Sequence, residues 1–206
     1  MYYYLITKQF NINGNSCRIR KIILLLILVV LLIGCTRANQ SEAPTSYPRI
    51  EANDHHNTTY QHRVAALKKD LAALSHQTDW IESERVAETA IGYSSYLAEE
   101  YELVRPAILH NVLIRLGLKD RGLCYHWTED LINRLQELNL KSYQLHWGVA
   151  HQGSELREHN SVVITARGQA FEKGIVLDPW RNSGDLYWAL IKFDRYPWKE
   201  LPPEKW

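Results

Sequence analysis

The segment "EHNSVVITARGQAFEKGIVLDPW", residues 158–180, contains two runs rich in β-branched residues with a polar stretch between them. Runs of this kind, separated by glycine, are typical of paired antiparallel strands. Gly168-Gln169 suits a two-residue turn with glycine at its first position. We therefore expect a tight hairpin, in which residues equally distant from the middle of this turn lie opposite each other.

The expected register brings a histidine and a carboxylate together. His159 and Asp178 would lie directly opposite each other, with Cβ atoms about 5 Å apart. A shift of one residue would move them to opposite faces, so their pairing depends on the position of the turn. The same face carries small side chains that would let a helix pack closely, namely Ser161, Val163, Gly174 and Val176. The other face would be an apolar core surface formed by Val162, Ile164, Ile175 and Leu177.

Upstream of this hairpin, "CYHWTEDLINRLQELNL", residues 124–140, predicts an amphipathic helix. Its apolar stripe recurs in steps of three and four residues and consists of Cys124, Trp127, Leu131, Leu135 and Leu138. Cys124 stands at the N-terminal end, where unpaired backbone N–H groups and the helix dipole favour a thiolate. Taken alone, the helix leaves two interpretations open: Cys124 is a small core residue, or it is a nucleophile.

A thiol nucleophile needs a base and a group that orients the base. The pieces "GLCYHWTEDL", "EHNSVVI" and "IVLDPW" supply a cysteine, a histidine and an aspartate in that order. On a helix start and two neighbouring strands, these pieces resemble the transglutaminase-like and papain-like cysteine peptidase superfamily over about residues 85–190. The resemblance implies an α+β fold, in which N-terminal helices precede an antiparallel sheet. It also implies that Cys124 is the nucleophile, His159 the general base and Asp178 the orienting residue, with no cofactor.

One residue of the papain branch has no counterpart here. That branch places a glutamine before the cysteine to bind the oxyanion, and no glutamine lies between Pro106 and Cys124. The backbone N–H of Cys124 would supply one oxyanion donor. The candidates for the second donor are Asn111, His146 and Trp147.

His146, Trp147 and Trp180 are further candidates for contacts with a substrate. The segment "SYQLHWGVA", residues 142–150, predicts a strand with Trp147 and His146 on opposite faces. His146 would border the cleft if this strand lies beside the histidine strand. Trp180 follows the aspartate and would form a wall. The aromatic segment "DLYWALIKFDRYPW", residues 185–198, predicts one more strand and a packed end.

A zinc site is the alternative use of the same residue types. Cys124, His126, His146 and His151 are candidate ligands, but no pair has the close spacing of zinc motifs. His126 lies two residues after Cys124, about 200° round the helix, and is expected to face away from it. The catalytic interpretation therefore stands ahead of metal binding.

Composition divides the chain into three parts. Residues 1–34 are typical of an export signal, and residues 35–59 form a polar tether with too little apolar surface to fold. Residues 60–206 predict one α+β domain, with helical patterns over 60–140 and strand patterns over 141–206.

Particular residues predict where the helices begin and end. An apolar stripe at helical spacing consists of Val64, Leu67, Leu71 and Leu74. Ser83 suits the start of the second helix. Pro106 suits the first turn of the third, and Gly117 suits its end.

The signal contains a basic patch, "RIRK" at 18–21, and an apolar run of 13 residues, "IILLLILVVLLIG". A membrane-spanning helix needs about 20 residues, so the run favours a cleaved export signal. A short uncleaved signal anchor is the alternative. The run leads into "LIGC" at 32–35, which resembles the bacterial lipobox. That resemblance implies cleavage before Cys35, a lipid on Cys35, and attachment to a membrane of the cell envelope through this lipid.

The charge balance and the remaining thiol narrow the range of possible functions. The chain has 24 basic and 23 acidic side chains, and four of the basic ones lie in residues 1–34. The mature protein would therefore be slightly acidic, and no basic stripe indicates a nucleic-acid partner. Thr36, after the lipidated cysteine, favours an outer membrane in a cell that has one. Cys124 would be the only free thiol of an exported protein, and structural cysteines of exported proteins normally pair.

These observations predict a lipid-anchored, extracytoplasmic thiol hydrolase or acyltransferase. It would act on the amide bond of a peptide, through a thioester intermediate, and the superfamily includes enzymes of cell-wall peptides. The main alternative is a non-catalytic member of the same superfamily that binds a cell-wall peptide or a protein partner at the membrane. A third interpretation is a structural lipoprotein in which the three residues do not meet.

Overall fold

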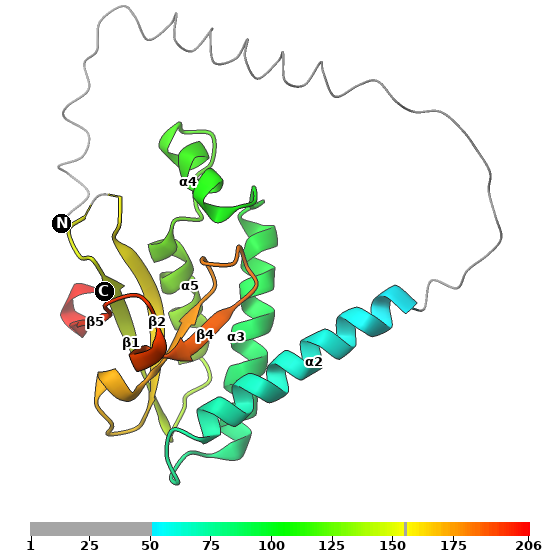
Figure 1. Cartoon of the computed structure of the whole chain (residues 1–206), viewed down its shortest axis with the longest axis vertical. Helices are drawn as coiled ribbons and strands as arrows, with labels where there is room; N and C mark the ends of the chain where they lie inside the picture. Colours follow the sequence, from blue (N-terminus) through cyan, green and yellow to red (C-terminus); the bar gives the residue numbers. More distant parts are fainter. Residues whose placement is uncertain (1–50, 155) are drawn as a thin grey trace, which may run out of the picture. The chain divides into compact units, whose positions relative to one another are not determined.

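The computed structural model describes residues 51–154 and 156–206, with only the backbone described at 51–57. The signal, Cys35 and the first part of the tether lie outside the described residues. In the described ranges, four helices precede a five-stranded antiparallel sheet, as Figure 1 shows. The predicted α+β order is therefore confirmed. No helix within these ranges is long and apolar enough to cross a membrane.

The helices are α2 (Glu51–Ala72), α3 (Trp80–Glu100), α4 (Ala107–Arg115) and α5 (Cys124–Gln136). α2 begins at Glu51, so residues 51–59 are helical where their polar composition predicted a tether. Composition was misleading because a polar stretch can open a helix whose apolar stripe begins later. The predicted stripe is confirmed at Val64, Leu67 and Leu71, which are buried.

α3 begins earlier than the sequence predicted. Asp79 is its N-cap, and the carboxylate accepts hydrogen bonds of 2.8 Å from the backbone N–H groups of Ile81 and Glu82. Ser83, predicted as the helix start, is instead a buried residue of α3, and its hydroxyl lies 2.6 Å from that of Tyr143. A carboxylate is among the strongest N-caps, which explains why the helix extends back to Asp79.

α4 begins and ends at the residues that the sequence indicated. Pro106 is its N-cap residue, and Gly117 follows its last turn with φ of +70°. Glycine is favoured there because this left-handed conformation costs it no steric strain. α5 begins at Cys124 itself.

The strands are β1 (Tyr143–Ala150), β2 (His159–Ala166), β3 (Ile175–Asp178), β4 (Tyr187–Leu190) and β5 (Lys199–Leu201), in the sheet order β4-β3-β2-β1-β5. The aromatic segment supplies β4 and the buried Trp198, as predicted. β5 was not predicted, because its three residues are too few and too polar to show a pattern.

The predicted tight hairpin is wrong. β2 ends at Ala166 and β3 begins at Ile175, and the connection contains the short 3-10 helix η1 (Phe171–Lys173). Val163 consequently lies opposite Val176 rather than Gly174. The error arose because Phe171 is buried and adds residues to the connection. The register moves by two residues, so His159 and Asp178 are diagonal neighbours that still share a face.

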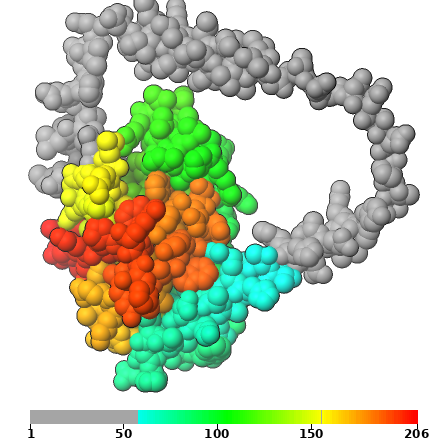
Figure 2. All heavy atoms as spheres, in the orientation of Figure 1, coloured from blue at the N-terminus to red at the C-terminus, as the bar shows by residue number. Residues whose placement is uncertain are grey.

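The expectation that a helix packs on the histidine face is also wrong. The helices pack on the opposite face, where Val162 and Leu177 meet Leu131 and Leu135 of α5 in the main core. The histidine face is covered by aromatic side chains, among them Phe171 and Trp198. Figure 2 shows the C-terminal segment, in red, packed beside the orange strands. Only the N-terminus of α5 therefore reaches His159, at the start of β2.

Candidate active site

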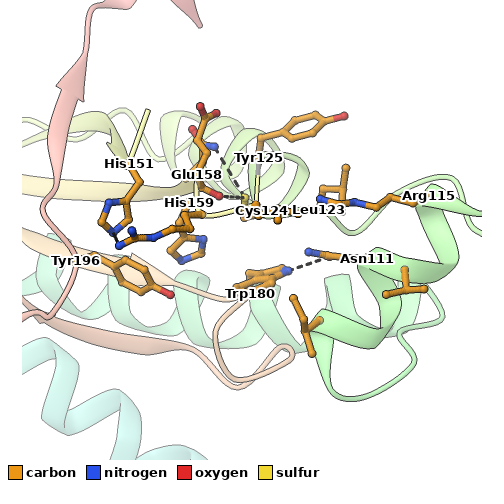
Figure 3. Close-up of a pocket in the computed structure, with 15 residues that line it drawn as sticks. Asn111, Arg115, Leu123, Cys124, Tyr125, His151, Glu158, His159, Trp180 and Tyr196 are labelled. Atoms are coloured by element: carbon orange, nitrogen blue, oxygen red, sulfur yellow. Dashed lines mark hydrogen bonds between the residues drawn. The ribbon is translucent and has the colours of Figure 1, made fainter. Parts of the chain in front are cut away.

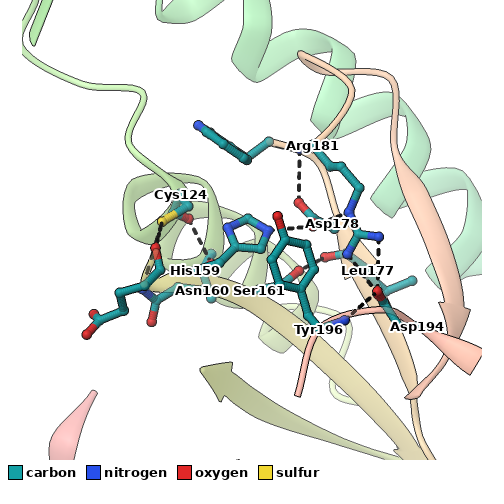
Figure 4. Close-up of polar contacts among 12 residues, drawn as sticks. Cys124, His159, Asn160, Ser161, Leu177, Asp178, Arg181, Asp194 and Tyr196 are labelled. Carbon is teal, nitrogen blue, oxygen red and sulfur yellow. Dashed lines mark hydrogen bonds and ion pairs between the residues drawn. The ribbon is translucent and has the colours of Figure 1, made fainter. Parts of the chain in front are cut away.

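Cys124 lies at the mouth of a cleft and not in the core. It is half-buried, and its thiol donates to the carbonyl oxygen of Glu158 at 3.9 Å. The Nδ2 group of Asn160 donates to the same sulfur, also at 3.9 Å. The residues of α5 that fill the core are Trp127 and Leu131, both completely buried. The sulfur at the helix start therefore contacts polar groups, unlike the rest of its stripe (Figure 4).

The turn before Cys124 is held rigidly. Gly122 has φ of +123°, and a Cβ at this position would lie 2.5 Å from Cδ2 of His110. The indole of Trp127 donates to the Gly122 carbonyl at 2.9 Å. His126 Nδ1 accepts hydrogen bonds from the backbone N–H groups of Gly122 and Leu123, at 3.1 and 3.2 Å. These contacts fix the direction in which the first residue of α5 points.

His126 can accept these bonds because its ring is neutral. Burial and the nearby charge of Arg121 lower the pKa of His126 to about 4. A protonated ring would have no acceptor for the two N–H groups. His126 thus caps the start of α5, and it does not line the cleft.

His159 and Asp178 form the second half of the site. His159 Nε2 lies 2.6 Å from Asp178 Oδ2, and both side chains are almost completely buried. The ring stands between Cys124 and Asp178 (Figure 4), which leaves Nδ1 for the thiol side. Burial opposes the charged ring, but hydrogen bonds with Asp178 and Cys124 outweigh it and raise the pKa of His159 to about 9. The ring is therefore protonated at neutral pH.

Three aromatic rings surround the imidazole of His159. Their centroids lie 4.9 Å from it for Trp180, 4.8 Å for Tyr196 and 5.4 Å for Trp198. Of these three residues, only Trp180 was predicted from the sequence to lie beside the site. The other two belong to the C-terminal segment, and no sequence pattern connects that segment with a strand end. Together the rings keep water away from the bond between His159 and Asp178.

Asp178 is held by a second buried ion pair. Arg181 donates through Nε to Asp178 Oδ2 at 2.9 Å and through its backbone N–H to Oδ1 at 3.1 Å. Its remaining nitrogens bind both oxygens of Asp194, at 3.1 and 2.8 Å. Burial would raise the pKa of Asp194, but the hydrogen bonds from Arg181 keep it below its usual range. Sequence reasoning missed Asp194 because it lies far along the chain and in no motif.

The predicted substrate contacts are brought together only in part. Trp180 lines the cleft, whereas His146 and Trp147 do not. His146 lies on the same face of the sheet as His159, but it pairs with Val163, four residues along β1 from Ala150, which pairs with His159. Glu200 and Thr165 lie 2.6 and 2.9 Å from its two ring nitrogens. Because each strand residue advances about 3.3 Å, His146 is too far along β1 to border the cleft.

Trp147 reaches the site through another residue. Its indole N–H donates to Oδ1 of Asn160 at 2.8 Å. With that oxygen engaged, the amide N–H of Asn160 points towards the sulfur of Cys124. Asn160 is only 7% exposed. Asn160 was not predicted from the sequence to have a role, although it stands directly after His159.

The cleft has a volume of about 550 Å³ and runs across the sulfur. One wall comes from α4 and combines the apolar Ile108 and Val112 with the polar Asn111 and Arg115, while the opposite wall holds His151 and Arg157 from the loop between β1 and β2. Figure 3 shows these two walls on either side of Cys124 and His159. Asn111 lies on the α4 wall and accepts a hydrogen bond from the Trp180 indole at 3.2 Å.

The four candidate zinc ligands do not come together. His126 faces the turn before α5, and His146 lies further along β1 beside Glu200 and Thr165, while Cys124 and His151 line the cleft. No three His, Cys, Asp or Glu side chains gather as metal ligands in the part of the chain that the structure describes.

Comparison with protein-family models, with curated proteins and with solved structures gave no match for this chain. The chemistry of the site is therefore inferred from its geometry. A thiol at a helix start, a buried protonated imidazole and an oriented carboxylate form one chain beside an open cleft. This arrangement can form and cleave a thioester.

Proposed function

We propose that this protein is a thiol hydrolase or acyltransferase with a transglutaminase-like domain. The observation that carries the proposal is the row of Cys124, His159 and Asp178, in which Cys124 and His159 line the cleft and Asp178 is buried behind the ring. A buried histidine–aspartate pair beside a half-buried thiol is costly to maintain, and pairs of this kind concentrate at functional sites. The substrate would be an amide or ester carbonyl of a peptide.

His159 carries the proton in the proposed reaction, since it gives a proton to the leaving group and takes one back from water. In the reactive state that we propose, the protonated ring of His159 faces Cys124 as a thiolate, which no longer donates to the carbonyl oxygen of Glu158. The sulfur attacks the substrate carbonyl, and Nδ1 of His159 gives its proton to the leaving amine, which yields a thioester. Neutral His159 then takes a proton from the attacking water, and the acid departs with restoration of the thiolate. A second amine in place of water would give acyl transfer.

Asn160 supplies the second oxyanion donor in this scheme, together with the backbone N–H of Cys124. Its Nδ2 lies beside the sulfur, and Trp147 fixes the amide orientation. Donors held in place before the reaction stabilise the developing oxyanion most effectively. Of the candidates named from the sequence, Trp147 thus acts through Asn160. Asn111 remains on the far wall, where it binds Trp180.

The proposed setting is the cell envelope. The segment that would carry the lipid lies before α2, and the described residues contain no membrane-spanning helix. A lipid on Cys35 would then place the cleft near a membrane and its peptide substrates. Incorporation of labelled palmitate, lost in Cys35→Ala, would support this part of the proposal.

Acylation of the sulfur tests the proposed function. Residues 48–206 form one compact unit, and Cys124 is the only cysteine within them. We expect p-nitrophenyl acetate to release a burst of p-nitrophenol and to add one acetyl group to Cys124, detected by mass spectrometry. His159→Gln should abolish the burst. Equal acetylation rates in the folded protein, in His159→Gln and in the unfolded chain would refute the proposal and leave a binding role for the cleft.

A further inference from the structure

A second hollow adjoins the active-site cleft. It has a volume of about 520 Å³, and its lining includes Val149, Pro197 and Lys199. His151 and Arg157 line both hollows, so the two are adjacent on the side of the β1–β2 loop. Lys199 stands on β5 opposite Val149 of β1. A substrate that enters at Cys124 can therefore extend past Arg157 towards Lys199.

The lining of this second hollow is basic. It contains His151, Arg157 and Lys199, and none of its lining residues in the described part of the chain is acidic. Arg157 and Lys199 form no ion pair with a carboxylate of the described residues, whereas the cleft's neighbour Arg181 is fully paired. Residues 35–206 carry more acidic than basic side chains. Positive charge on this wall thus runs against the balance of the chain.

The single carboxylate that lines the first hollow among the described residues is already engaged. Glu158 accepts a hydrogen bond of 2.6 Å from the backbone N–H of Gly153 through Oε2. Arg157 makes one long contact, 3.5 Å from Nη2 to His151 Nε2. His151 adopts φ of +53°, a conformation that costs energy in a residue other than glycine. The loop accepts this strain while it presents both side chains to the hollows.

We propose that the acyl donor carries a carboxylate, which Arg157 and Lys199 bind in the second hollow while the scissile carbonyl lies at Cys124. The proposal rests on the function proposed above and adds the substrate class, an acidic peptide. The planar fork of arginine matches a carboxylate with two parallel hydrogen bonds. On the α4 wall, the apolar side chains of Ile108 and Val112, both more than 40% exposed, face the opposite part of the substrate.

Alkylation of Cys124 tests this charge preference without any substrate. Iodoacetate and iodoacetamide have nearly the same size and differ by one negative charge. We expect the ratio of their rates, relative to the ratio for a small free thiol, to fall in Arg157→Gln and Lys199→Gln. Loss of one charge from the wall of a partly aqueous cleft corresponds to a change of roughly two- to five-fold in this ratio. Added salt should reduce the ratio as well.

Lys173→Gln is the matched control. Lys173 is exposed and lies on η1, beyond the end of β2 opposite to His159. The variant removes one positive charge from a side chain that is exposed like Arg157 and Lys199 but lies away from the cleft, so it should leave the alkylation ratio unchanged. An equal fall in all three variants would show a general charge effect and overturn the assigned subsite.

A second arm separates carboxylate from phosphate. Glutarate and inorganic phosphate are compared at equal concentration as protectants of Cys124 against iodoacetamide. Protection by glutarate that is lost in Arg157→Gln supports the proposal, whereas protection by phosphate alone overturns the carboxylate assignment. Peptide p-nitroanilides with Glu or Gln at successive positions then extend the test to kcat/KM.

The two proposals fail in different ways. If p-nitrophenyl acetate acylates Cys124 but the alkylation ratio ignores Arg157 and Lys199, the acidic-substrate proposal is wrong and the thiol chemistry stands. If the anion preference is present but no acyl group reaches Cys124, the proposed function is wrong and the cleft is a binding site for anions.

Discussion

The sulfur of Cys124 is surrounded by groups whose roles depend on single hydrogen bonds. Asn160 donates to the sulfur, and its other amide atom accepts from Trp147. His159 faces the thiol because Nε2 is bound to Asp178. Each of these side chains has one orientation in which its chemistry works, and a neighbour on another strand fixes that orientation.

Asn160→Ala should lower kcat for p-nitrophenyl acetate by about 10²-fold or more, the usual effect of removing one oxyanion donor. Trp147→Phe keeps an aromatic ring but removes the indole N–H, so kcat should fall by part of this amount while KM stays nearly unchanged. Steady-state kinetics of both variants measure the effect. Full activity in Asn160→Ala would assign the second donor elsewhere, with Asn111→Ala as the next variant.

The pH dependence should differ between amide and ester substrates. Because the pKa of His159 is raised to about 9, its ring is protonated below that pH and loses its proton above it. A leaving amine needs that proton, whereas p-nitrophenolate does not. We therefore expect acylation by a peptide anilide to fall above about pH 9, while acylation by p-nitrophenyl acetate continues. Parallel profiles for the two substrates would contradict the role of His159 as the acid.

At the scale of elements, the N-terminus of α5 and the start of β2 must meet within a few ångströms. Periodicity predicted α5 and the strand of His159, since both are long and regular. It could not predict η1, and the expected turn was therefore wrong, although the even shift in register kept His159 and Asp178 on one face. Asp194, Tyr196 and Trp198 lie in irregular chain, where sequence has no period and only tertiary contact decides position.

Gly122→Ala tests how strictly the start of α5 is held. The new Cβ would meet His110 at 2.5 Å with φ at +123°, so unfolding should become easier by at least about 2 kcal/mol. Gly168→Ala is the control, because Gly168 also has positive φ, +79°, but no atom lies within 4 Å. That change should cost about 1 kcal/mol from strain alone. Urea denaturation of both variants measures the difference, and equal losses would contradict the close contact with His110.

At the scale of the whole molecule, the active site joins the two sides of the sheet. Helices cover one face, and the aromatic C-terminal segment covers the other. Arg181 holds the C-terminal segment to the sheet, since it binds Asp178 at the end of β3 and Asp194 in that segment. The stability of the domain and the position of His159, the proposed base, therefore depend on the same buried charges.

Asp194→Ala should destabilise the protein by about 2–5 kcal/mol, because it leaves a buried guanidinium with half of its partners. Asp185→Ala removes a similar partner from Arg63, but Asp185 is 59% exposed, so its loss should cost less than about 1 kcal/mol. Thermal denaturation of the two variants compares them directly. A small loss in Asp194→Ala would mean that Arg181 gains sufficient solvent contact to remain charged without it.

The contact of residues 194–198 with His159 has a consequence for the way the protein is made. The ribosome adds Cys124 seventy residues before Asp194. During that interval the sulfur has neither its imidazole nor the aromatic rings that shield it. Under the proposed function, the nascent chain therefore carries an unactivated thiol, and thioester chemistry begins only when the later segment has packed on the sheet.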